Sequence, residues 1–290
     1  MNLPNKKQFL ESLDSHILGR YGLGKWRKKV FFSTLINFIP LLKSLIKNSV
    51  SKHGIRDLTF VSRAYINIYD TSNEDWIESR VSRQELFRMG KQSLNVNGWF
   101  LMKYFCKIYE HVIKETKSLD VLEVGSGRGN NAVILALNNP NVHITGLEYV
   151  DSGVKRSQEM LNNPPIFLDS SLDSHIDSSK RVSLIERVNF IQGNACEMPF
   201  DDKSFDLTYT SLVFEQMPHK YEDALKEINR VTKNYVVFIE PFKEANNALG
   251  KAKLKSMDYF RYSYKSFQQF GFEPIAFIND IPQKLHFGTA

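Results

Sequence analysis

Cysteine is scarce in this sequence, with Cys106 and Cys196 the only two among 290 residues. They form no Cys-x-x-Cys pattern, which excludes a disulfide framework or a cysteine-rich zinc site as the basis of the fold. A chain of this length can bury enough apolar surface to fold without such cross-links. We therefore expect two reduced thiols packed as small hydrophobic residues, in a protein of the cytoplasm.

A long apolar run is also absent. The most apolar stretch, Val30–Leu42, has 13 residues without a formal charge, fewer than the roughly 20 needed to cross a bilayer. It follows a basic cluster and lacks a small-residue cleavage site, which argues against a signal peptide. A spanning helix and a cleaved leader are therefore not expected.

Acidic residues are nearly missing from one end of the chain. Residues 1–56 contain eleven Lys and Arg but only Glu11 and Asp14, a net charge of +9, whereas the remainder carries −3. A strongly basic end favours an anionic partner, such as membrane lipid, nucleic acid or a phosphorylated substrate.

The same end shows helical amphipathicity. Large apolar side chains fill most faces, and other residues recur at steps of three and four, at Ser33, Asn37, Pro40, Ser44, Lys47 and Ser51. Two interpretations stay open: a helix that caps the ligand cleft of the main domain, or a peripheral helix in an anionic membrane surface. Pro40 cannot donate a hydrogen bond to Ile36, so we expect a kink or a break there.

Two kinds of pattern divide the chain. The first part is helical, with helices expected at Val81–Leu94 and Trp99–Ile113, and the second part alternates strands with helices. We therefore predict an N-terminal helical extension over residues 1–116 and an α/β domain over residues 117–290.

The second part predicts a doubly wound, mostly parallel sheet of seven strands. Helices are expected between most of these strands, including Lys220–Val231. The expected strands are Asp120–Val124, His143–Glu148, Val188–Gln192, Phe205–Ser211 and Tyr235–Glu240, then a last pair at Glu273–Ile281 and Leu285–Gly288.

The first of these strands runs directly into a glycine-rich turn with Gly125, Gly127 and Gly129. Glycines allow a close approach of backbone to ligand, and the helix that follows begins with unpaired N–H groups. The GxGxG spacing differs from the GxGxxG of dinucleotide-binding turns, because Asn130 stands where the third glycine would be. Glu123, just before the turn, would repel a diphosphate but suits a ligand that carries an ammonium group. Both features argue against an NAD-dependent oxidoreductase.

The next two strands also end in residues suited to a nucleoside. Glu148 closes the second strand, where a carboxylate can accept hydrogen bonds from both hydroxyls of a ribose. Asn194 and Ala195 follow the third strand and offer an amide and an apolar contact to an adenine.

In order and spacing, these segments resemble the class I S-adenosylmethionine (SAM)-dependent methyltransferases that act on small molecules and lipids. The resemblance covers about Ser118–Ile275. It rests on VLEVGSGRG, an acid-ended strand, GNA followed by MPFDDKSFD, and a helix that ends in EINRVTK. It implies a Rossmann-like methyltransferase fold with SAM as the cofactor.

The resemblance also implies roles for single residues. The glycine turn and its preceding acid would hold the methionine portion of SAM, Glu148 the ribose, and the residues after the third strand the adenine. Asn194 stands where the family usually has Asp, so the adenine amino group would meet a neutral amide oxygen. The expected cofactor contacts are Glu123, Gly125, Ser126, Gly127, Gly129, Asn130, Glu148, Tyr149, Asn194, Ala195 and Ser211.

The chemistry of the cofactor limits what the protein must add. A sulfonium methyl is already activated, so the enzyme mainly aligns an acceptor atom, and a base is needed only for a hydroxyl or a carbon acid. Glu215 and His219 are the candidate catalytic residues, as base or orienting group. Relatives often carry Glu-His where this chain has Glu215 and Gln216. No metal-ligand pattern is present, and no metal is expected.

The apolar N-terminal segment favours a small or lipid-linked acceptor, such as a quinone or a fatty-acyl chain. A nucleic-acid methyltransferase is an alternative, but the basic residues have no aromatic stacking platform among them. The fourth strand also lacks the Asn/Asp-Pro-Pro-aromatic motif of base-modifying enzymes. A second alternative is a non-catalytic binding module that keeps this fold but transfers no methyl group.

Overall fold

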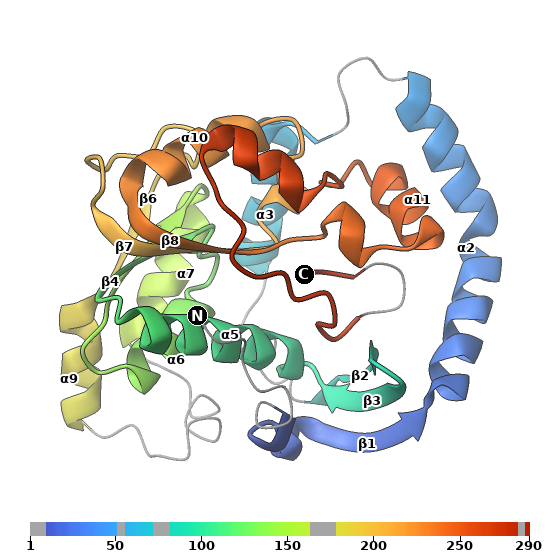
Figure 1. Cartoon of the computed structure of the whole chain (residues 1–290), viewed down its shortest axis with the longest axis horizontal. Coiled ribbons are helices and arrows are strands. Elements are labelled where there is room, and N and C mark those ends of the chain that lie inside the picture. The colour runs from blue at the N-terminus through green and yellow to red at the C-terminus, as the bar shows by residue number, and fades with distance from the viewer. Residues whose placement is uncertain (1–9, 51–55, 72–81, 163–177, 284–287) are drawn as a thin grey trace.

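A central parallel sheet with helices on both sides forms the body of the protein, and a helix lies along its outer edge (Figure 1). The structure is a computed structural model, and it describes residues 10–50, 56–71, 82–162, 178–283 and 288–290. Its helical elements are η1 (Asp14–His16), α2 (Leu23–Val50), α3 (Leu58–Thr71), α5 (Phe100–Thr116), α6 (Asn130–Asn138), α7 (Asp151–Asn162), α9 (Ser178–Arg187), η2 (Phe214–Gln216), α10 (Tyr221–Val231), η3 (Lys243–Ala245), α11 (Ala248–Ser256) and η4 (Tyr264–Phe270). Its strands are β1 (Ile17–Gly22), β2 (Gln84–Met89), β3 (Gln92–Asn97), β4 (Asp120–Val124), β5 (His143–Glu148), β6 (Val188–Gln192), β7 (Phe205–Ser211) and β8 (Thr232–Ile239).

The central sheet has five parallel strands in the order β6-β5-β4-β7-β8. The doubly wound α/β fold predicted from the sequence is confirmed, and the strands β4 to β7 have the predicted bounds. Strand β8 begins three residues earlier than predicted, at Thr232. Because the strand order reverses between β4 and β7, the carboxyl ends of these two strands border the crevice where such sheets bind ligands.

Both faces of the sheet are buried, which explains the nearly continuous apolar character of its strands. Val121 of β4 packs with α5 and α6 on one face, and Leu122 packs with α10 and η4 on the other. Strand geometry therefore turns Glu123 toward the α5 and α6 face, in line with Val121.

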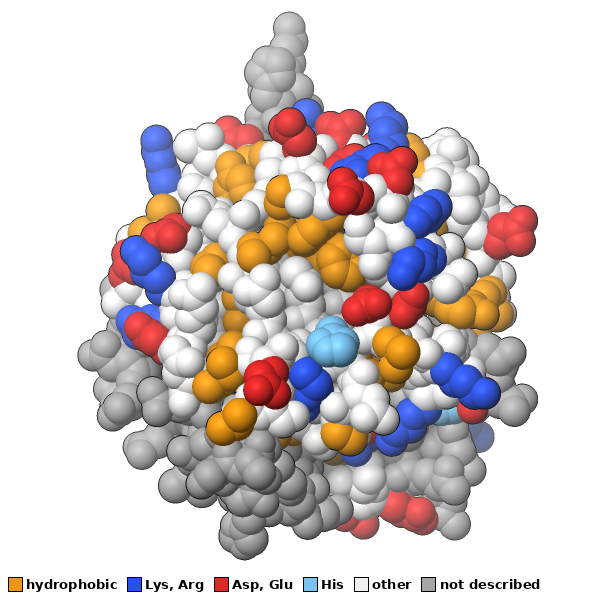
Figure 2. All heavy atoms as spheres, turned by 90° about the vertical axis from the view of Figure 1, so that its left-hand side faces the viewer, with side chains coloured by type: hydrophobic (Ala, Val, Ile, Leu, Met, Phe, Trp, Pro, Cys, Tyr) orange, Lys and Arg blue, Asp and Glu red, His pale blue; other side chains and the backbone are white. Residues whose placement is uncertain are grey.

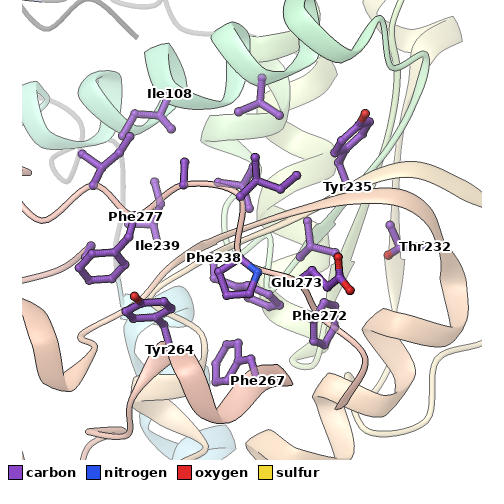
Figure 3. A pocket seen from close by; sticks show the side chains of 18 of the residues that line it. Ile108, Thr232, Tyr235, Phe238, Ile239, Tyr264, Phe267, Phe272, Glu273 and Phe277 are labelled. Atoms are coloured by element: carbon purple, nitrogen blue, oxygen red, sulfur yellow. The ribbon is translucent and has the colours of Figure 1, made fainter. Parts of the chain in front are cut away.

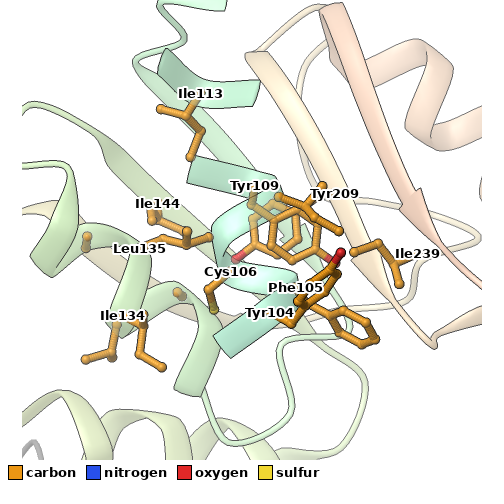
Figure 4. Close-up of a cluster of buried hydrophobic side chains, with 14 of the residues drawn as sticks. Tyr104, Phe105, Cys106, Tyr109, Ile113, Ile134, Leu135, Ile144, Tyr209 and Ile239 are labelled. Carbon is orange, nitrogen blue, oxygen red and sulfur yellow. The ribbon is translucent and has the colours of Figure 1, made fainter. Parts of the chain in front are cut away.

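The core on the α5 and α6 face is built around two stacked tyrosines (Figure 4). Tyr109 of α5 and Tyr209 of β7 have ring centroids 4.2 Å apart. The hydroxyl of Tyr109 donates to the carbonyl of Thr210 at 2.9 Å and lies 2.6 Å from Ser211 Oγ. This helix therefore anchors the end of β7, which borders the ligand crevice. Cys106 is buried in the same core, and both cysteines are free thiols.

The helix predicted at Val81–Leu94 is wrong. This segment forms the antiparallel pair β2 and β3, joined by a two-residue turn with Gly90 at φ +57°. Phe87 and Met89 alternate with exposed Arg88 in β2, a period of two that fits a strand with one buried face. β1 adds to the other edge of β3, so the predicted helical extension contains a small sheet in the order β1-β3-β2.

The seventh and sixth strands predicted at the C-terminus do not appear in the part of the chain that the structure describes. Residues 273–281 have no strand pairing, and the segment 285–288 lies mostly outside the described residues. The side chains of 271–281 instead lie along β8 and border a hollow of about 510 Å³ (Figure 3). Phe238, Phe267 and Phe272 contact one another there, with centroids between 4.9 and 6.5 Å apart.

The N-terminal helices lie in two different places. Helix α2 is continuous through Pro40 and runs along the outer edge of the molecule (Figure 1). Of the two outcomes predicted at Pro40, the break does not occur, and the kink stays a prediction. Helix α3 packs against α7, at the carboxyl edge of the sheet. None of the helices within the described residues has the length and apolarity needed to span a membrane.

Candidate functional site

The glycine turn after β4 supplies the floor of the site. Gly125, Gly127 and Gly129 have φ values of +73°, +57° and +76°. Residues with a Cβ rarely adopt this left-handed region of backbone conformation. The N–H groups of Gly125 and Ser126 both donate to the carbonyl of Leu147, at 2.8 and 3.1 Å. These two bonds tie the turn to the end of β5.

Close packing surrounds all three of these glycines. A Cβ at Gly125 would lie 2.6 Å from a methyl group of Val213, and a Cβ at Gly127 would lie 3.2 Å from the Tyr69 hydroxyl. At Gly129, a Cβ would approach Phe190 to 2.5 Å. Gly129 therefore packs the turn against β6, whereas Gly125 and Gly127 face the space above the sheet.

Glu148, at the end of β5, is buried beside the turn. One carboxylate oxygen accepts the N–H of Gly127 at 2.8 Å, and the other accepts the N–H of Val150 at 3.0 Å. Burial raises the pKa of this carboxyl above its usual value, and the backbone donors act in the opposite direction. Each oxygen keeps a second lone pair, so the group can accept further hydrogen bonds from a ligand.

Glu123 lies beneath the turn rather than beside the open space. Its side chain is 1% exposed, and one carboxyl oxygen accepts a hydrogen bond from Asn131 Nδ2 at 2.9 Å. Burial raises the pKa of this carboxyl to about 8. A cationic group bound above the turn would favour the ionised form and lower that pKa.

Two cavities open above this edge of the sheet, and both are covered by α3. The first, of about 130 Å³, lies between Glu148, the β6 end at Gly193 to Ala195, and the β7 end. The second, of about 410 Å³, lies between Ser126 to Asn131, α5 and the start of β2. Tyr65 and Tyr69 of α3 line both cavities.

The start of α3 is fastened to the other side of the cleft by Arg56. Its guanidinium donates to Gln216 Oε1 at 2.6 Å and to the carbonyl of Met257 at 3.0 Å. The same group lies 4.3 Å from the ring centroid of Tyr259. Helix α3 is thereby held as a cover over the carboxyl edge of the sheet.

The segment after β7 is held by a buried acid at the end of β8. Glu240 accepts hydrogen bonds from Thr210 Oγ1 at 2.8 Å and from the N–H groups of Val213 and Phe214 at 3.0 and 3.1 Å. These bonds fix Val213, which borders the first cavity beside Gly125.

The two candidate catalytic residues have different surroundings. Glu215 accepts a hydrogen bond from Gln216 Nε2 at 2.8 Å, and burial raises the pKa of its carboxyl to about 7. His219 Nε2 lies 2.9 Å from Asp258 Oδ2 at an exposed position, and it lines neither cavity. Glu215 also lines neither cavity, so a catalytic role for either residue stays a prediction, and the raised pKa distinguishes Glu215 from His219.

Most of the predicted cofactor residues come together at these cavities. Glu123 and Gly129 lie in the supporting layer below. The residues that line the first cavity are Gly125, Glu148, Tyr149, Asn194, Ala195 and Ser211, and those that line the second are Ser126, Gly127, Asn130 and Ser211.

Helix α3 supplies site residues that the sequence reasoning missed. Leu58, Val61, Tyr65 and Tyr69 line the first cavity. The last three recur every four residues and so share one face of a helix. This spacing was visible in the sequence, but nothing in it showed which surface that face would cover.

Comparisons with known proteins agree with this geometry. A family model described as a methyltransferase domain matches residues 122–239. The demethylmenaquinone methyltransferase of Staphylococcus aureus strain JH9 is 33% identical over 122 residues, covering 42% of this chain and 41% of that protein. The protein of the same name from Listeria monocytogenes strain HCC23 is 28% identical over 123 residues, covering 42% and 44%. The chain thus matches less than half the length of either relative.

A solved structure supports the fold over a longer stretch. A candidate O-methyltransferase from Nostoc punctiforme superposes with a TM-score of 0.50 at 15% identity, covering 84% of this chain and 66% of that one. At this identity the likeness concerns the fold alone. The glycine turn and the acid that closes β5 both lie within the matched residues, so this part of the chain is similar to a methyltransferase domain.

Proposed function

We propose that this protein transfers a methyl group from SAM to a small or lipid-linked acceptor. The observation that carries the proposal is the meeting of a positive-φ glycine turn with the buried carboxylate of Glu148 at one cavity. No group of three or more metal-ligating side chains occurs within the described ranges, so the proposal assigns no metal.

The residues at the turn fit such a cofactor. Ser126 Oγ and Asn130 Oδ1 are buried without a hydrogen-bond partner among the described residues, and both residues border the second cavity. Buried polar atoms normally have partners, so these two are available to a polar ligand above the turn. A Cβ at Gly125 would meet Val213 and one at Gly127 would lie 3.2 Å from the Tyr69 hydroxyl, so a side chain at either position would crowd the edge of the cavities.

Each part of the cofactor would be held by a different strand end. Glu148 would accept hydrogen bonds from the ribose hydroxyls, and Asn194 with Ala195 would flank the adenine. The turn at Gly125 and Gly127, supported by Glu123, would hold the amino-acid portion. When bound, SAM supplies an electrophilic methyl group, and the protein's main task is to align the acceptor with it and exclude water.

The second cavity is the proposed site of the acceptor. Ile68, Leu101, Met102 and Phe105 give it an apolar wall, with Arg83 at its border. Such a wall suits a hydrophobic molecule with a polar end. The names of the two bacterial relatives, which refer to demethylmenaquinone, support an apolar acceptor of this kind.

Glu215 would accept the proton if the acceptor is a hydroxyl or a carbon acid. Because the pKa of its carboxyl is about 7, the active carboxylate form increases as the pH rises. We expect kcat to rise about tenfold per pH unit below pH 7 and to level off above it. Glu215→Gln should remove this dependence and lower kcat by roughly 10²- to 10⁴-fold, the usual contribution of a general base.

Two variants separate this role from a general effect of charge. Glu222→Gln changes an exposed acid on α10, and His219→Asn changes the residue paired with Asp258. Both should keep the wild-type pH profile. A Glu215→Gln enzyme with an unchanged profile would remove Glu215 from the mechanism.

Transfer itself is tested with methyl-labelled SAM and a panel of isoprenoid quinols, fatty acids and RNA. The proposal predicts label in the organic extract and none in RNA, with loss of the signal in Glu148→Ala. Label that enters RNA would favour the nucleic-acid alternative. Absence of transfer to any acceptor, with SAM still bound, would favour a non-catalytic binding module.

A further inference from the structure

Helix α2 exposes large apolar side chains, whereas a helix on a protein surface normally exposes its polar face. Large apolar side chains along it are between 54% and 75% exposed. Helical spacing places them on one side of the helix, over about four turns. They are Phe31, Phe32, Leu35, Ile36, Phe38, Ile39 and Ile46, and we call them the apolar face of α2.

The side of α2 that faces the protein carries polar residues beside apolar ones. Trp26, Ser33, Asn37 and Ser44 share one face by their spacing, and Trp26 is buried while the other three are half-buried. Ser44 Oγ donates to the carbonyl of Ser256 in α11. The more apolar side of α2 therefore points away from the body of the protein, and no described segment covers it.

Exposure on this scale is unusual. Single exposed hydrophobic residues are normal on protein surfaces, but a contiguous patch of large apolar side chains marks a binding surface. Folding does not bury this face, so its stabilisation has to come from something outside the described chain.

The charges around the apolar face identify the kind of surface that it fits. Lys25, Arg27, Lys28 and Lys29 are all exposed at the N-terminal end of α2, and Lys43 is exposed near its other end. Residues 15–56 contain nine basic residues and no acidic residue. A second copy of the chain would bring these like charges together, which disfavours a dimer through this face.

The opposite side of the molecule has a different character. Figure 2 shows the side that lies on the left in Figure 1, away from α2, and Lys and Arg there are interspersed with Asp and Glu. The unbalanced positive charge and the continuous apolar face therefore coincide on the edge that α2 forms.

We propose that α2 lies in the interface of an anionic membrane. Its apolar face would enter the acyl-chain boundary, and the flanking Lys and Arg side chains would extend to the phosphates of the headgroups. The body of the protein, which holds the polar side of α2, would stay on the aqueous side. This proposal does not depend on methyl transfer or on the identity of the acceptor.

Sedimentation with lipid vesicles tests the proposal on the full chain. We expect strong binding to vesicles with 30% phosphatidylglycerol in phosphatidylcholine, and binding at least tenfold weaker to phosphatidylcholine alone, since each nearby cation favours anionic lipid. Replacing Ile36 and Ile39 by serine should weaken binding to the anionic vesicles by tenfold or more. Lys28→Gln with Lys29→Gln should reduce the preference for anionic lipid.

A matched pair of substitutions controls for the loss of exposed apolar surface. Val182 and Ile275 are 58% and 63% exposed but lie far from α2 in the chain, and their serine variants should bind vesicles as the wild type does. SAM affinity should be unchanged in the Ile36/Ile39 variant, the Lys28/Lys29 variant and the serine variants of Val182 and Ile275. This result would separate the test from the proposed function. Equal vesicle binding by the wild type and the Ile36/Ile39 variant would overturn the proposal. A wild-type dimer that the same variant converts to a monomer, without vesicle binding, would assign the face to a second copy instead.

Discussion

Replacement of Gly127 by valine is expected to lower the affinity for SAM by roughly 100-fold or more while the protein stays folded. Gly127 has φ +57°, which costs a β-branched residue about 1–3 kcal/mol. A side chain there would also crowd the Tyr69 hydroxyl, 3.2 Å from the Cβ position, at the border of the second cavity. Isothermal titration calorimetry measures the affinity, and circular dichroism checks the fold.

Gly90 offers a control with the same backbone strain. It also has φ +57°, but a Cβ there would have nothing within 4 Å, and it lies in the turn between β2 and β3. Gly90→Val should destabilise the protein by a similar amount and leave SAM affinity within about twofold of the wild type. Equal affinities for the wild type and Gly127→Val would show that the cofactor does not use this turn.

Replacement of Glu148 by alanine is expected to have an effect of similar size. The carboxylate would lose two hydrogen bonds from ribose hydroxyls, each worth about 1.5–3 kcal/mol for a charged acceptor, so SAM affinity should fall by at least about 100-fold. The alanine substitution would also leave the N–H groups of Gly127 and Val150 without their present acceptor. Calorimetry with S-adenosylhomocysteine as a second ligand tests the ribose contact without the sulfonium charge.

Asp151 is the matched control for this acid. It begins α7, three residues after Glu148, and forms an ion pair with Lys155 at 2.7 Å on the surface. Asp151→Asn should bind both ligands as the wild type does. If Glu148→Ala retained wild-type affinity for both, the ribose would have to be held elsewhere and the assigned site would be wrong.

The central sheet could be read from the sequence because its signals are local. β4 to β7 are short apolar runs, each followed by glycine, a polar residue or a turn, and burial on both faces requires that composition. The glycine turn and Glu148 then follow from the rule that parallel strands end at the same edge. These parts of the site depend on strand order alone.

The errors occur where tertiary contacts decide the structure. Residues 84–97 contain apolar positions that fit a helix as well as a hairpin, and β3 pairs on both sides, with β1 from a distant segment and with β2. The amphipathic spacing of α2 was predicted, but the face that it turns toward the body of the protein was not, because the sequence does not show which side of a helix is covered. The cap interpretation applies instead to α3, which covers the cleft.

The candidate site was incomplete for the same reason. Tyr65 and Tyr69 lie more than fifty residues before the glycine turn, and they reach it because Arg56 fastens α3 across the cleft. Glu240 acts on the site through the backbone of Val213. Neither relation produces a sequence motif, since each depends on a contact between distant segments. The domain boundary near residue 117 and the cytoplasmic location stay predictions.

Thermal unfolding of the unmodified chain with and without SAM tests the central claim most directly. A ligand that binds only the folded state must stabilise it, by about 2.7 kcal/mol at a concentration 100 times its dissociation constant. We predict a clear rise in Tm with SAM and S-adenosylhomocysteine, and none with NADH. A rise with NADH, and no change with either adenosyl ligand, would contradict the account.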